Sequence, residues 1–375
     1  MNRLVAIDAP GGQLFLDQLK RIWEHGDAAL PVDQRLPTAA KRALFESVRP
    51  SAIVDGNGWE SPIEGGVPTL TGDAVVIATS GTTGDPKGVV LTHGALEASA
   101  VASSAWLRVD PATDAWYGCL PVAHIGGFSV VTKALLTGTR LSLVAAFAAE
   151  DVHSAAVTHT HISLVTTALA RIDASRWHCI LLGGSAMPDQ LPPAVTRTYG
   201  LTETGSGMVY DGFPIDGAEL RAVDGQIHVR GPMLFRAYRS LMPEGSSALD
   251  SDGWFATGDA GSIDTNGVVQ IRGRIGDVIV TGAEKVWPDA VERVLAGFAG
   301  IREVAVAGRP DSEWGQRVVV WVVPVDAANP PTLPAIREHV KSVLPAYAAP
   351  KALVIVDQLP RTAIGKIQRN LLTET

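Results

Sequence analysis

The sequence predicts an α/β protein with a large N-terminal domain of layered α/β sheets plus a small antiparallel β portion, followed by a small α+β C-terminal domain. The chain has 375 residues, about 2.5 times the ordinary domain size of roughly 150 residues. Hydrophobic residues make up 46% of it and charged residues 19%, so it can bury a large core and does not fit the disordered class. Apolar strand-like runs alternate with helical patterns through most of its length, which is typical of α/β layers.

The first half supplies the expected sheet layers. Residues 74–79 and 89–91 are apolar runs typical of strands that are buried on both faces. A helical pattern follows over residues 95–105, with Thr92 in the position of its N-cap. We therefore expect helices to flank a sheet.

From about residue 210 the pattern changes to short strands and turns, such as 225–232 and 266–271, which favour antiparallel pairing. Beyond Arg274 we expect a compact α+β unit of about 100 residues. The boundary is placed near Gly276, which gives domains 1–275 and 276–375. The expected elements are a helix opened by Pro288 with Val291, Val294 and Leu295 on one face, strands at 304–307 and 318–323, a helix that aligns Ile336, Val340, Val343 and Leu344, and a strand at 353–356.

Charge and cysteine content argue against several classes of protein. The 31 Lys and Arg residues against 39 Asp and Glu residues give a net charge of −8, the wrong sign for a chain whose main partner is nucleic acid. The two cysteines, Cys119 and Cys179, lie in apolar strand-like context. They are expected to be reduced, inert core residues in a cytosolic compartment.

Neither export nor membrane insertion is expected. The N-terminus reaches Asp8 after only four apolar residues, too few for a signal peptide. The longest charge-free stretch, residues 154–170, is interrupted by threonines and histidines and falls short of the roughly 18 continuous apolar residues of a membrane span. The sequence thus predicts a soluble, cytoplasmic protein without a membrane partner.

The sharpest motif is the segment of residues 79–88, TSGTTGDPKG, which follows a buried-strand pattern. Its glycines let backbone N–H groups approach an anion, its hydroxyls offer donors to phosphate oxygens, and Lys87 adds a positive charge. It is not the P-loop of the common NTPases, because that loop needs Gly-Lys-Ser/Thr and here Lys87 precedes Gly88. Any one of these residues alone would indicate a polar turn, whereas ten in this order indicate a phosphate loop. The expected nucleotide ligands are Thr79, Ser80, Gly81, Thr82, Thr83 and Lys87.

This segment resembles the phosphate loop of the acyl-adenylate-forming superfamily, which includes acyl-CoA synthetases, adenylation domains of peptide synthetases and luciferases. Residues 199–204 are similar to the second nucleotide segment of that superfamily. The metal in such a site neutralises the pyrophosphate leaving group and prefers a carboxylate oxygen. Alone, Glu203 would more simply be a solvated surface carboxylate. The resemblance assigns adenine packing to Tyr199, phosphate contacts to Thr202 and Thr204, and Mg²⁺ to Glu203, and it places Gly200 among the nucleotide-binding residues.

Two further segments are similar to nucleotide-binding parts of the same superfamily. Gly183, Gly184 and Ser185 follow a strand-like run and resemble the turn at the adenine edge, although alone they would indicate an ordinary strand-end turn. Asp259 and Arg274 match the pair that holds the ribose hydroxyls, because a carboxylate accepts hydroxyl protons and a guanidinium supplies donors. Alone, they would be a turn residue and a surface cation.

The segment of residues 360–369 resembles the one that carries the superfamily's mobile catalytic lysine, here Lys366. When a carboxylate attacks the α-phosphate of ATP, an ammonium between the two anionic reactants offsets their repulsion. Without the motif, Lys366 would be a solvated lysine. At the hinge the chain has Gly276 where relatives carry a polar residue, and glycine can absorb the backbone rotation of a moving small domain.

The acyl substrate is indicated by resemblance alone. Residues 120–128 and 199–212 are similar to the o-succinylbenzoate:CoA ligases of the actinobacterial type, which serve menaquinone biosynthesis. The small residues at 205–207 leave room for a ring, and His124 can donate to an acyl oxygen, with a merely packed histidine as an equal alternative. For the second carboxylate of the substrate, His161, Lys133 and Arg171 all remain open.

The implied enzyme is an AMP-forming acid–thiol ligase that uses ATP, Mg²⁺ and coenzyme A and forms o-succinylbenzoyl-CoA through an acyl-AMP intermediate. Alternatives are a ligase for another aryl or medium-chain acid, and a non-catalytic nucleotide-binding module. Activation of an amino acid is disfavoured, because residues 120–131 contain no carboxylate for the ammonium of such a substrate. Whether the chain forms a homo-oligomer is left open. The expected catalytic residues are Lys366, Glu203, Thr202 and His124.

Overall fold

The computed structural model describes residues 2–80, 86–184, 190–239, 248–361 and 367–374. The chain forms two compact units. The first consists of Met1–Gly184, Pro192–Leu220 and Val229–Phe255, and the second of Ser185–Leu191, Arg221–His228 and Ala256–Thr375. Because the second unit takes in residues ahead of Gly276, a domain boundary at that glycine stays a prediction.

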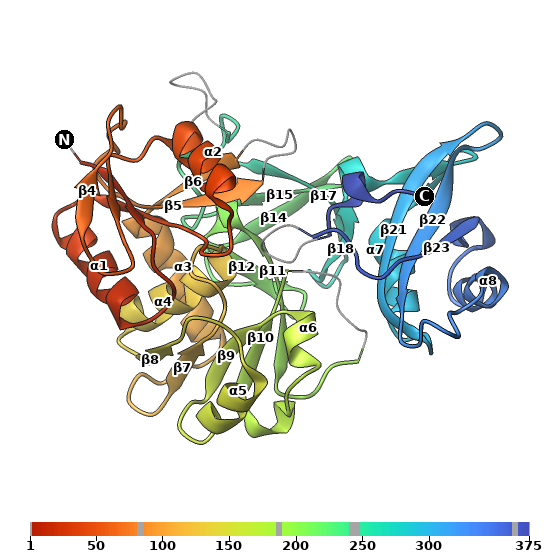
Figure 1. Ribbon diagram of the computed structural model, residues 1–375, viewed down its shortest axis with the longest axis horizontal. Coiled ribbons are helices and arrows are strands. Elements are labelled where there is room, and N and C mark those ends of the chain that lie inside the picture. Colours follow the sequence, from red (N-terminus) through yellow and green to blue (C-terminus); the bar gives the residue numbers. More distant parts are fainter. Residues whose placement is uncertain (1, 81–85, 185–189, 240–247, 362–366, 375) are drawn as a thin grey trace. The chain divides into compact units, whose positions relative to one another are not determined.

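The first unit contains two seven-stranded sheets, which Figure 1 shows in red to green. In one of them the strand order is β16-β6-β5-β2-β1-β3-β4, and β5, β2, β1 and β3 run parallel. Every residue of β1 and β2 is buried, as expected for strands covered on both faces. The bounds are β1 (Leu4–Ile7), β2 (Ala28–Pro31), β3 (Ala52–Val54), β4 (Glu60–Pro62), β5 (Asp73–Ser80), β6 (Pro86–Thr92) and β16 (Ala237–Arg239).

The other sheet has the order β13-β12-β11-β10-β9-β7-β8. Its strands β11, β10, β9, β7 and β8 run parallel, and β12 and β13 are added antiparallel at one edge. The parallel strands place their carboxyl ends at the same edge of the sheet, where α/β proteins bind ligands. The bounds are β7 (Ala115–Gly118), β8 (Arg140–Leu143), β9 (His161–Leu164), β10 (Cys179–Leu182), β11 (Val195–Leu201), β12 (Ser206–Tyr210) and β13 (Phe213–Pro214).

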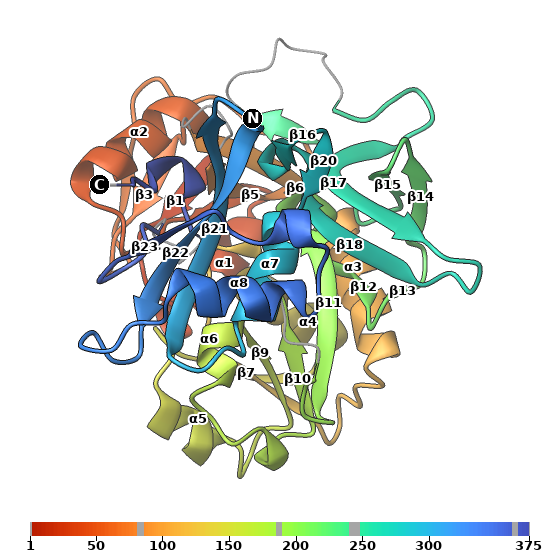
Figure 2. The ribbon, with the colours of Figure 1, turned by 90° about the vertical axis from the view of Figure 1, so that its right-hand side faces the viewer.

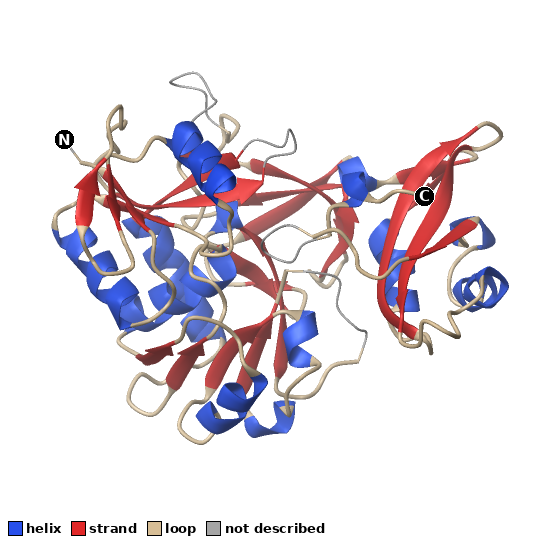
Figure 3. Cartoon of the chain, in the orientation of Figure 1, coloured by secondary structure: helices blue, strands red, loops and turns tan. Residues whose placement is uncertain are grey.

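Helices α3 and α4 pack against each other between these two sheets (Figures 1 and 3). Helix α3 contacts β6 of one sheet and β12 of the other. It begins at His93, two residues before the predicted start, and Thr92 is its N-cap, accepting a hydrogen bond from Ala95 N at 3.1 Å as the sequence predicted. The helices of this unit are α1 (Gln13–Glu24), α2 (Thr38–Val48), α3 (His93–Trp106), α4 (Ile125–Thr137), α5 (Ala149–Ala155) and α6 (Thr166–Leu169).

A four-stranded sheet has the order β14-β15-β17-β18. Strands β17 and β18 are antiparallel, with Asp259 opposite Arg274. The short strands and turns predicted from about residue 210 are confirmed here. The bounds are β14 (Glu219–Val223), β15 (Gln226–Arg230), β17 (Phe255–Ile263) and β18 (Val269–Arg274), and a 3₁₀ turn at Ile275–Asp277 follows.

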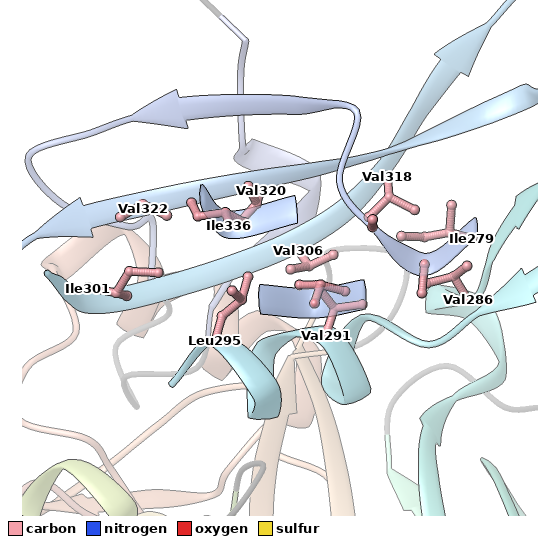
Figure 4. Close-up of a cluster of buried hydrophobic side chains, with 13 residues drawn as sticks. Ile279, Val286, Val291, Leu295, Ile301, Val306, Val318, Val320, Val322 and Ile336 are labelled. Atoms are coloured by element: carbon pink, nitrogen blue, oxygen red, sulfur yellow. The ribbon is translucent and has the colours of Figure 1, made fainter. Parts of the chain in front are cut away.

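The C-terminal part of the second unit is a five-stranded sheet with the order β20-β19-β22-β21, in which β23 also pairs with β22. Helices α7 and α8 cover one face of it and pack on each other (Figure 2). Figure 4 shows the core beneath them, where Val291 and Leu295 of α7 and Ile336 of α8 meet strand residues such as Val320. The bounds are β19 (Ile279–Thr281), β20 (Glu284–Val286), α7 (Pro288–Leu295), β21 (Ile301–Asp311), β22 (Gly315–Pro324), α8 (Leu333–Lys341) and β23 (Ala352–Ile355).

The predicted fold class, layered α/β followed by a small α+β domain, is confirmed, with one correction in helix α8. This helix ends at Lys341, so Val343 and Leu344 lie beyond it, and Val343 is 63% exposed. Pro345 follows closely, and a proline cannot continue a helix. None of the helices in the described ranges combines the length and apolar character that a membrane crossing demands.

The two cysteines agree with their predicted role as inert core residues. Cys119 and Cys179 are buried and free. Burial raises the pKa of each thiol to about 12. Neither is therefore a reactive thiolate at neutral pH.

Candidate active site

The two ends of the predicted phosphate loop lie on the paired antiparallel strands β5 and β6. Thr79 pairs with Lys87 across the two strands, and the Thr79 hydroxyl lies 3.4 Å from the Lys87 carbonyl oxygen. The pairing continues to Ser80 and Pro86. The strands thus bring both ends of the motif together. The candidates Gly81, Thr82 and Thr83 lie outside the described residues.

The second predicted segment follows β11 and forms a 3₁₀ turn at Thr202–Thr204. A Cβ atom at Gly200 would lie 2.0 Å from the carbonyl oxygen of Ser206, so the close pairing of β11 with β12 requires glycine there. The Thr204 hydroxyl is buried, accepts from Leu201 N at 2.8 Å and lies 2.6 Å from the Ser206 carbonyl oxygen. Its hydrogen bonds hold the turn, and its contact with a nucleotide stays a prediction, as do those of Tyr199 and Thr202.

The Glu203 carboxylate is held by a residue that the sequence motifs did not reveal. Tyr238 Oη donates to Glu203 Oε1 at 2.8 Å. Strand β16 places this tyrosine by pairing it with Val89 of β6. Lys87 Nζ lies 5.6 Å from the centre of the same ring, within range of a cation–π interaction. Tyr238 therefore links the phosphate-loop lysine to the expected metal ligand, a connection to which no local sequence signal points.

The donor set around Glu203 fits Mg²⁺ bound together with a nucleotide. One carboxylate oxygen accepts from Tyr238, which leaves Oε2 to face a cation. Within the described ranges there is no group of three or more His, Cys, Asp and Glu side chains that can hold a metal alone. Mg²⁺ commonly takes one or two carboxylates and completes its shell with phosphate oxygens and water. A single carboxylate is consistent with that mode.

The predicted adenine-edge turn begins at the carboxyl end of β10. A Cβ atom at Gly183 would lie 2.7 Å from Thr198 Oγ1, whose hydroxyl donates to the Leu182 carbonyl oxygen at 3.1 Å. Gly184 has φ +90°, a conformation that other residues rarely adopt. The Thr198 side chain thus leaves no room for a Cβ atom at Gly183, and the backbone conformation favours glycine at 184. Ser185 lies outside the described residues.

Of the three residues left open for the second carboxylate, Lys133 is the one that contacts the small-residue segment 205–207. Its Nζ lies 3.2 Å from Ser206 Oγ, and its side chain is 1% exposed. Burial lowers the pKa of this lysine to about 7. His161 is instead buried within β9, and Arg171 lies 5.1 Å from the ring centre of Phe147. Lys133 is the only charged residue in the sequence of α4, a signal that could have distinguished it from the other two.

His124 precedes α4 and has a carboxylate partner that was not foreseen. Its Nε2 atom lies 2.9 Å from Asp33 Oδ2. Asp33 follows β2, which belongs to the other seven-stranded sheet of the same unit. The two residues are 91 positions apart in the sequence, which explains why no local pattern could have found the pair.

The two predicted ribose ligands are brought together in the second unit. Arg274 Nε lies 2.9 Å from Asp259 Oδ1, and Arg274 NH1 donates to the Thr257 carbonyl oxygen at 2.9 Å. The predicted catalytic Lys366 lies outside the described residues. Its neighbours Arg361 and Ile367 form an isolated antiparallel bridge. The roles of these three residues stay predictions.

Comparisons with known proteins agree with the motifs. A family model described as AMP-binding enzyme matches residues 67–239, and another described as AMP-binding enzyme C-terminal domain matches residues 290–366. A Mycobacterium tuberculosis protein named "Probable 2-succinylbenzoate--CoA ligase" is 37% identical over 329 residues, which are 80% of this chain and 83% of that protein. A Bacillus cereus 2-succinylbenzoate--CoA ligase is 34% identical over 340 residues, 80% of this chain and 69% of that protein.

Solved structures give the same result. The o-succinylbenzoate CoA synthetase from Bacillus subtilis in complex with its acyl-adenylate intermediate superimposes with a TM-score of 0.87 at 27% identity, covering 100% of this chain and 88% of that one. The same enzyme with ATP and magnesium ion gives a TM-score of 0.85 at 27% identity, with coverages of 99% and 89%. With relatives this similar along four fifths of its length, the chain belongs to the AMP-binding enzyme family.

Proposed function

We propose that this protein is an ATP-dependent 2-succinylbenzoate–CoA ligase that acts in the cytoplasm in menaquinone biosynthesis. It first joins one carboxylate of the substrate to AMP with release of pyrophosphate, and it then transfers the acyl group to the thiol of coenzyme A. The names of its relatives and the ligands of its structural neighbours support this activity. Activation as acyl-AMP is needed because a free carboxylate is a poor electrophile for a thiol.

The residues around the β5–β6 hairpin supply the electrostatics of the first half-reaction. Lys87 and the phosphate-loop segment would bind phosphate oxygens, and Glu203, oriented by Tyr238, would hold Mg²⁺, which would neutralise the charge of the pyrophosphate. Asp259 and Arg274 hold the ribose hydroxyls. Lys366 brings a further positive charge to the attacking carboxylate and the α-phosphate. The small domain then rotates about Gly276 for the second half-reaction.

The observation that carries the substrate assignment is the buried amino group of Lys133. Its Nζ atom donates to the hydroxyl of Ser206, and no carboxylate of the described residues lies within ion-pair distance of Nζ. A buried charge is stable only when it is paired. 2-Succinylbenzoate has two carboxylates, of which one is activated and one stays free. The free one supplies the anion that Lys133 lacks.

A panel of acids tests the proposal. Formation of CoA thioesters is measured by mass spectrometry with 2-succinylbenzoate, benzoate, hexanoate and the two analogues that each keep only one carboxylate of 2-succinylbenzoate. We expect 2-succinylbenzoate to have the highest kcat/KM. The analogue that keeps the reactive carboxylate should lose roughly 10-fold to 100-fold, the cost of leaving Lys133 unpaired. Preference for a monocarboxylic acid would establish the alternative of another aryl or medium-chain substrate.

The variant Lys366→Ala tests the two-step assignment. We expect it to abolish adenylate formation, measured by exchange of pyrophosphate into ATP. Thioester formation from supplied acyl-AMP should remain largely intact, because the lysine is needed only while the carboxylate attacks the phosphate. Equal losses in both half-reactions would contradict the role of Lys366. ATP binding without exchange for any acid, in the unmodified protein, would support a non-catalytic module instead.

A further inference from the structure

The pair formed by Asp33 and His124 has the geometry of a carboxylate that orients a catalytic imidazole. His124 Nε2 lies 2.9 Å from Asp33 Oδ2, and the Asp33 side chain is 5% exposed. The His124 side chain is 25% exposed, so the ring is accessible from one side. Among the residues that the structure describes, no other histidine has a carboxylate oxygen this close. His161 comes next, with its Nδ1 atom 3.9 Å from Asp114.

The contacts of Nε2 fix the position of the ring proton. This atom lies 2.9 Å from Asp33 Oδ2 and 3.1 Å from Arg35 NH2. A carboxylate only accepts hydrogen bonds and a guanidinium only donates them, so Nε2 can satisfy just one of the two. Arg35 already directs its Nε and NH2 groups to Oδ1 and Oδ2 of Asp33, at 2.9 and 2.8 Å. The consistent arrangement is that Nε2 carries a hydrogen and donates it to Asp33.

This arrangement keeps Asp33 ionised and leaves the other ring nitrogen free to accept. Burial acts to raise the pKa of the Asp33 carboxyl, but the hydrogen bonds from His124 and Arg35 outweigh it and hold this pKa well below its ordinary value. With the hydrogen on Nε2, the neutral ring has its lone pair on Nδ1. Nδ1 can therefore take up a proton, and Asp33 then stabilises the imidazolium that forms. The sequence predicted that His124 donates a hydrogen bond to an acyl oxygen. In the neutral ring with its hydrogen on Nε2, the Nδ1 atom instead accepts a hydrogen bond.

The pair lies at the edge of the first unit where its ligands are expected. Asp33 is two residues beyond the carboxyl end of β2, and His124 is six residues beyond the carboxyl end of β7. Glu203 and Gly183 follow the carboxyl ends of β11 and β10 in the same sheet as β7. Ligands of open α/β sheets bind outside these ends.

The second half-reaction needs a base, whereas the first does not. A carboxylate attacks ATP without losing a proton, but the thiol of coenzyme A must lose one when its sulfur bonds to the acyl carbon. We propose that His124 Nδ1 accepts this proton and that Asp33 is the residue that positions and charges His124 for it. The sulfur keeps the electron pair of its S–H bond and forms the S–C bond. The bond between the acyl carbon and the phosphate oxygen breaks, and AMP leaves with that electron pair. This inference rests on the proposed function.

Few charged groups of the described residues face the His124 ring. Asp33 and Arg35 both come from the loop after β2. Lys133, on α4 itself, faces Ser206 instead. The elements packed against α4 include α3, β7, β8, β9 and β12, and α1 through Trp23 on Phe128. Within the described ranges they place no ionisable side chain at hydrogen-bonding or ion-pair distance from the His124 ring.

The test separates the two half-reactions in the full-length variants His124→Gln and Asp33→Asn. Supplied with acyl-AMP and coenzyme A at neutral pH, His124→Gln should form thioester roughly 100-fold more slowly, the usual contribution of a general base. Asp33→Asn should lose about 10-fold, since it removes only the charge behind the ring. Exchange of pyrophosphate into ATP should stay within about threefold of the unmodified protein in both variants.

Raising the pH distinguishes a base from a structural residue. At about pH 9.5 a thiol of ordinary pKa near 8.5 is already ionised and needs no base. Both variants should therefore form thioester only a few-fold more slowly than the unmodified protein at this pH. The matched control is Asp8→Asn, which removes a carboxylate paired with Lys41 and Gln34 at the end of β1. It should leave the thioester step unchanged at both pH values.

The proposal would be overturned if the variants still formed thioester slowly at high pH. It would also be overturned if they lost pyrophosphate exchange to the same extent as thioester formation. If Asp33→Asn fails to fold, His124→Gln alone decides the question, because its ring is partly exposed. Failure of the proposed function has a different signature. In that case the unmodified protein would give no pyrophosphate exchange with any acid.

Discussion

Tyr238 Oη donates a 2.8 Å hydrogen bond to Glu203 Oε1 across 35 residues of sequence. The ring that carries this hydroxyl also lies 5.6 Å from Lys87 Nζ. One side chain therefore orients the carboxylate expected to bind Mg²⁺ and contacts the lysine expected to bind phosphate. The two motifs, far apart in the sequence, are joined by a strand, β16, that belongs to neither.

We expect Tyr238→Phe to weaken the metal-dependent half-reaction. A hydrogen bond to a charged group contributes about 1.5 to 3 kcal/mol, so adenylate formation should fall roughly 10-fold to 100-fold at limiting Mg²⁺. Pyrophosphate exchange measured over a magnesium titration should show a higher half-saturating concentration. The control is Tyr210→Phe, which removes a hydroxyl bound to Ser103 in the core. It should lower stability without moving the magnesium dependence, and an equal shift in both variants would exclude a special role for Tyr238.

The low pKa of Lys133 predicts that substrate affinity depends on pH. Burial lowers this pKa to about 7, so above that pH the free side chain is neutral and must take up a proton to pair with a carboxylate. KM for 2-succinylbenzoate should therefore rise from neutral pH toward pH 9, by at most about tenfold per pH unit. Lys133→Arg keeps its charge throughout and should flatten the profile. A KM that is independent of pH in the unmodified protein would contradict the pairing.

The sequence predicted those structural features that depend only on residues close together along the chain. The N-cap at Thr92 and the proline at the start of α7 were foreseen because capping and the fixed φ of proline are local properties. The strands β5 and β6 were foreseen from unbroken apolar runs. The hairpin of β21 and β22 was underestimated, since polar residues at its ends are held by cross-strand pairing that no local pattern reveals.

The contacts that make the site could not be predicted from the sequence. Asp33 meets His124, and Tyr238 meets Glu203, only because different strands bring them together. The sequence left Lys133 open together with two other residues for the second carboxylate, and it did not indicate that Ser206 is its partner. The motifs therefore gave the candidate residues, and the topology gave their pairings.

Gly200 should be the least replaceable glycine of the second nucleotide segment. A Cβ atom there would lie 2.0 Å from the Ser206 carbonyl oxygen and 2.6 Å from the Gly207 Cα atom, both of them backbone atoms. We expect Gly200→Ala to cost about 1 to 3 kcal/mol or more of unfolding free energy and to abolish pyrophosphate exchange. In Gly94→Ala the new methyl group would have only Thr92 Oγ1 near it, at 4.0 Å. That variant should be neutral or stabilised by up to about 1 kcal/mol in urea denaturation.

The last prediction concerns a buried ion pair in the second unit. Arg369 NH2 lies 2.7 Å from Glu292 Oε2 and 2.8 Å from Asp289 Oδ1, and Arg369 NH1 lies 3.3 Å from Asp277 Oδ2. Glu292 is buried and also accepts from Val306 N at 2.7 Å. Removing one partner of a buried pair leaves an uncompensated charge, so Arg369→Met should cost about 3 to 5 kcal/mol of unfolding free energy near neutral pH.

The sign of the pH dependence identifies the cause of that loss. Burial raises the pKa of Glu292, and Arg369 acts to lower it, so without the arginine this pKa rises further. The folded variant then holds a proton that the unfolded chain releases, and stability falls as pH rises from about 4.5 toward neutral. The loss of unfolding free energy in Arg369→Met should therefore be smaller near pH 5 than near pH 8, and adding Glu292→Gln should recover most of it.

The control is Arg361→Met, which breaks the exposed pair with Glu303. It should cost less than about 1 kcal/mol of unfolding free energy at either pH. A loss for Arg369→Met that is constant with pH and unaffected by Glu292→Gln would show that packing, and not charge, is what the arginine supplies.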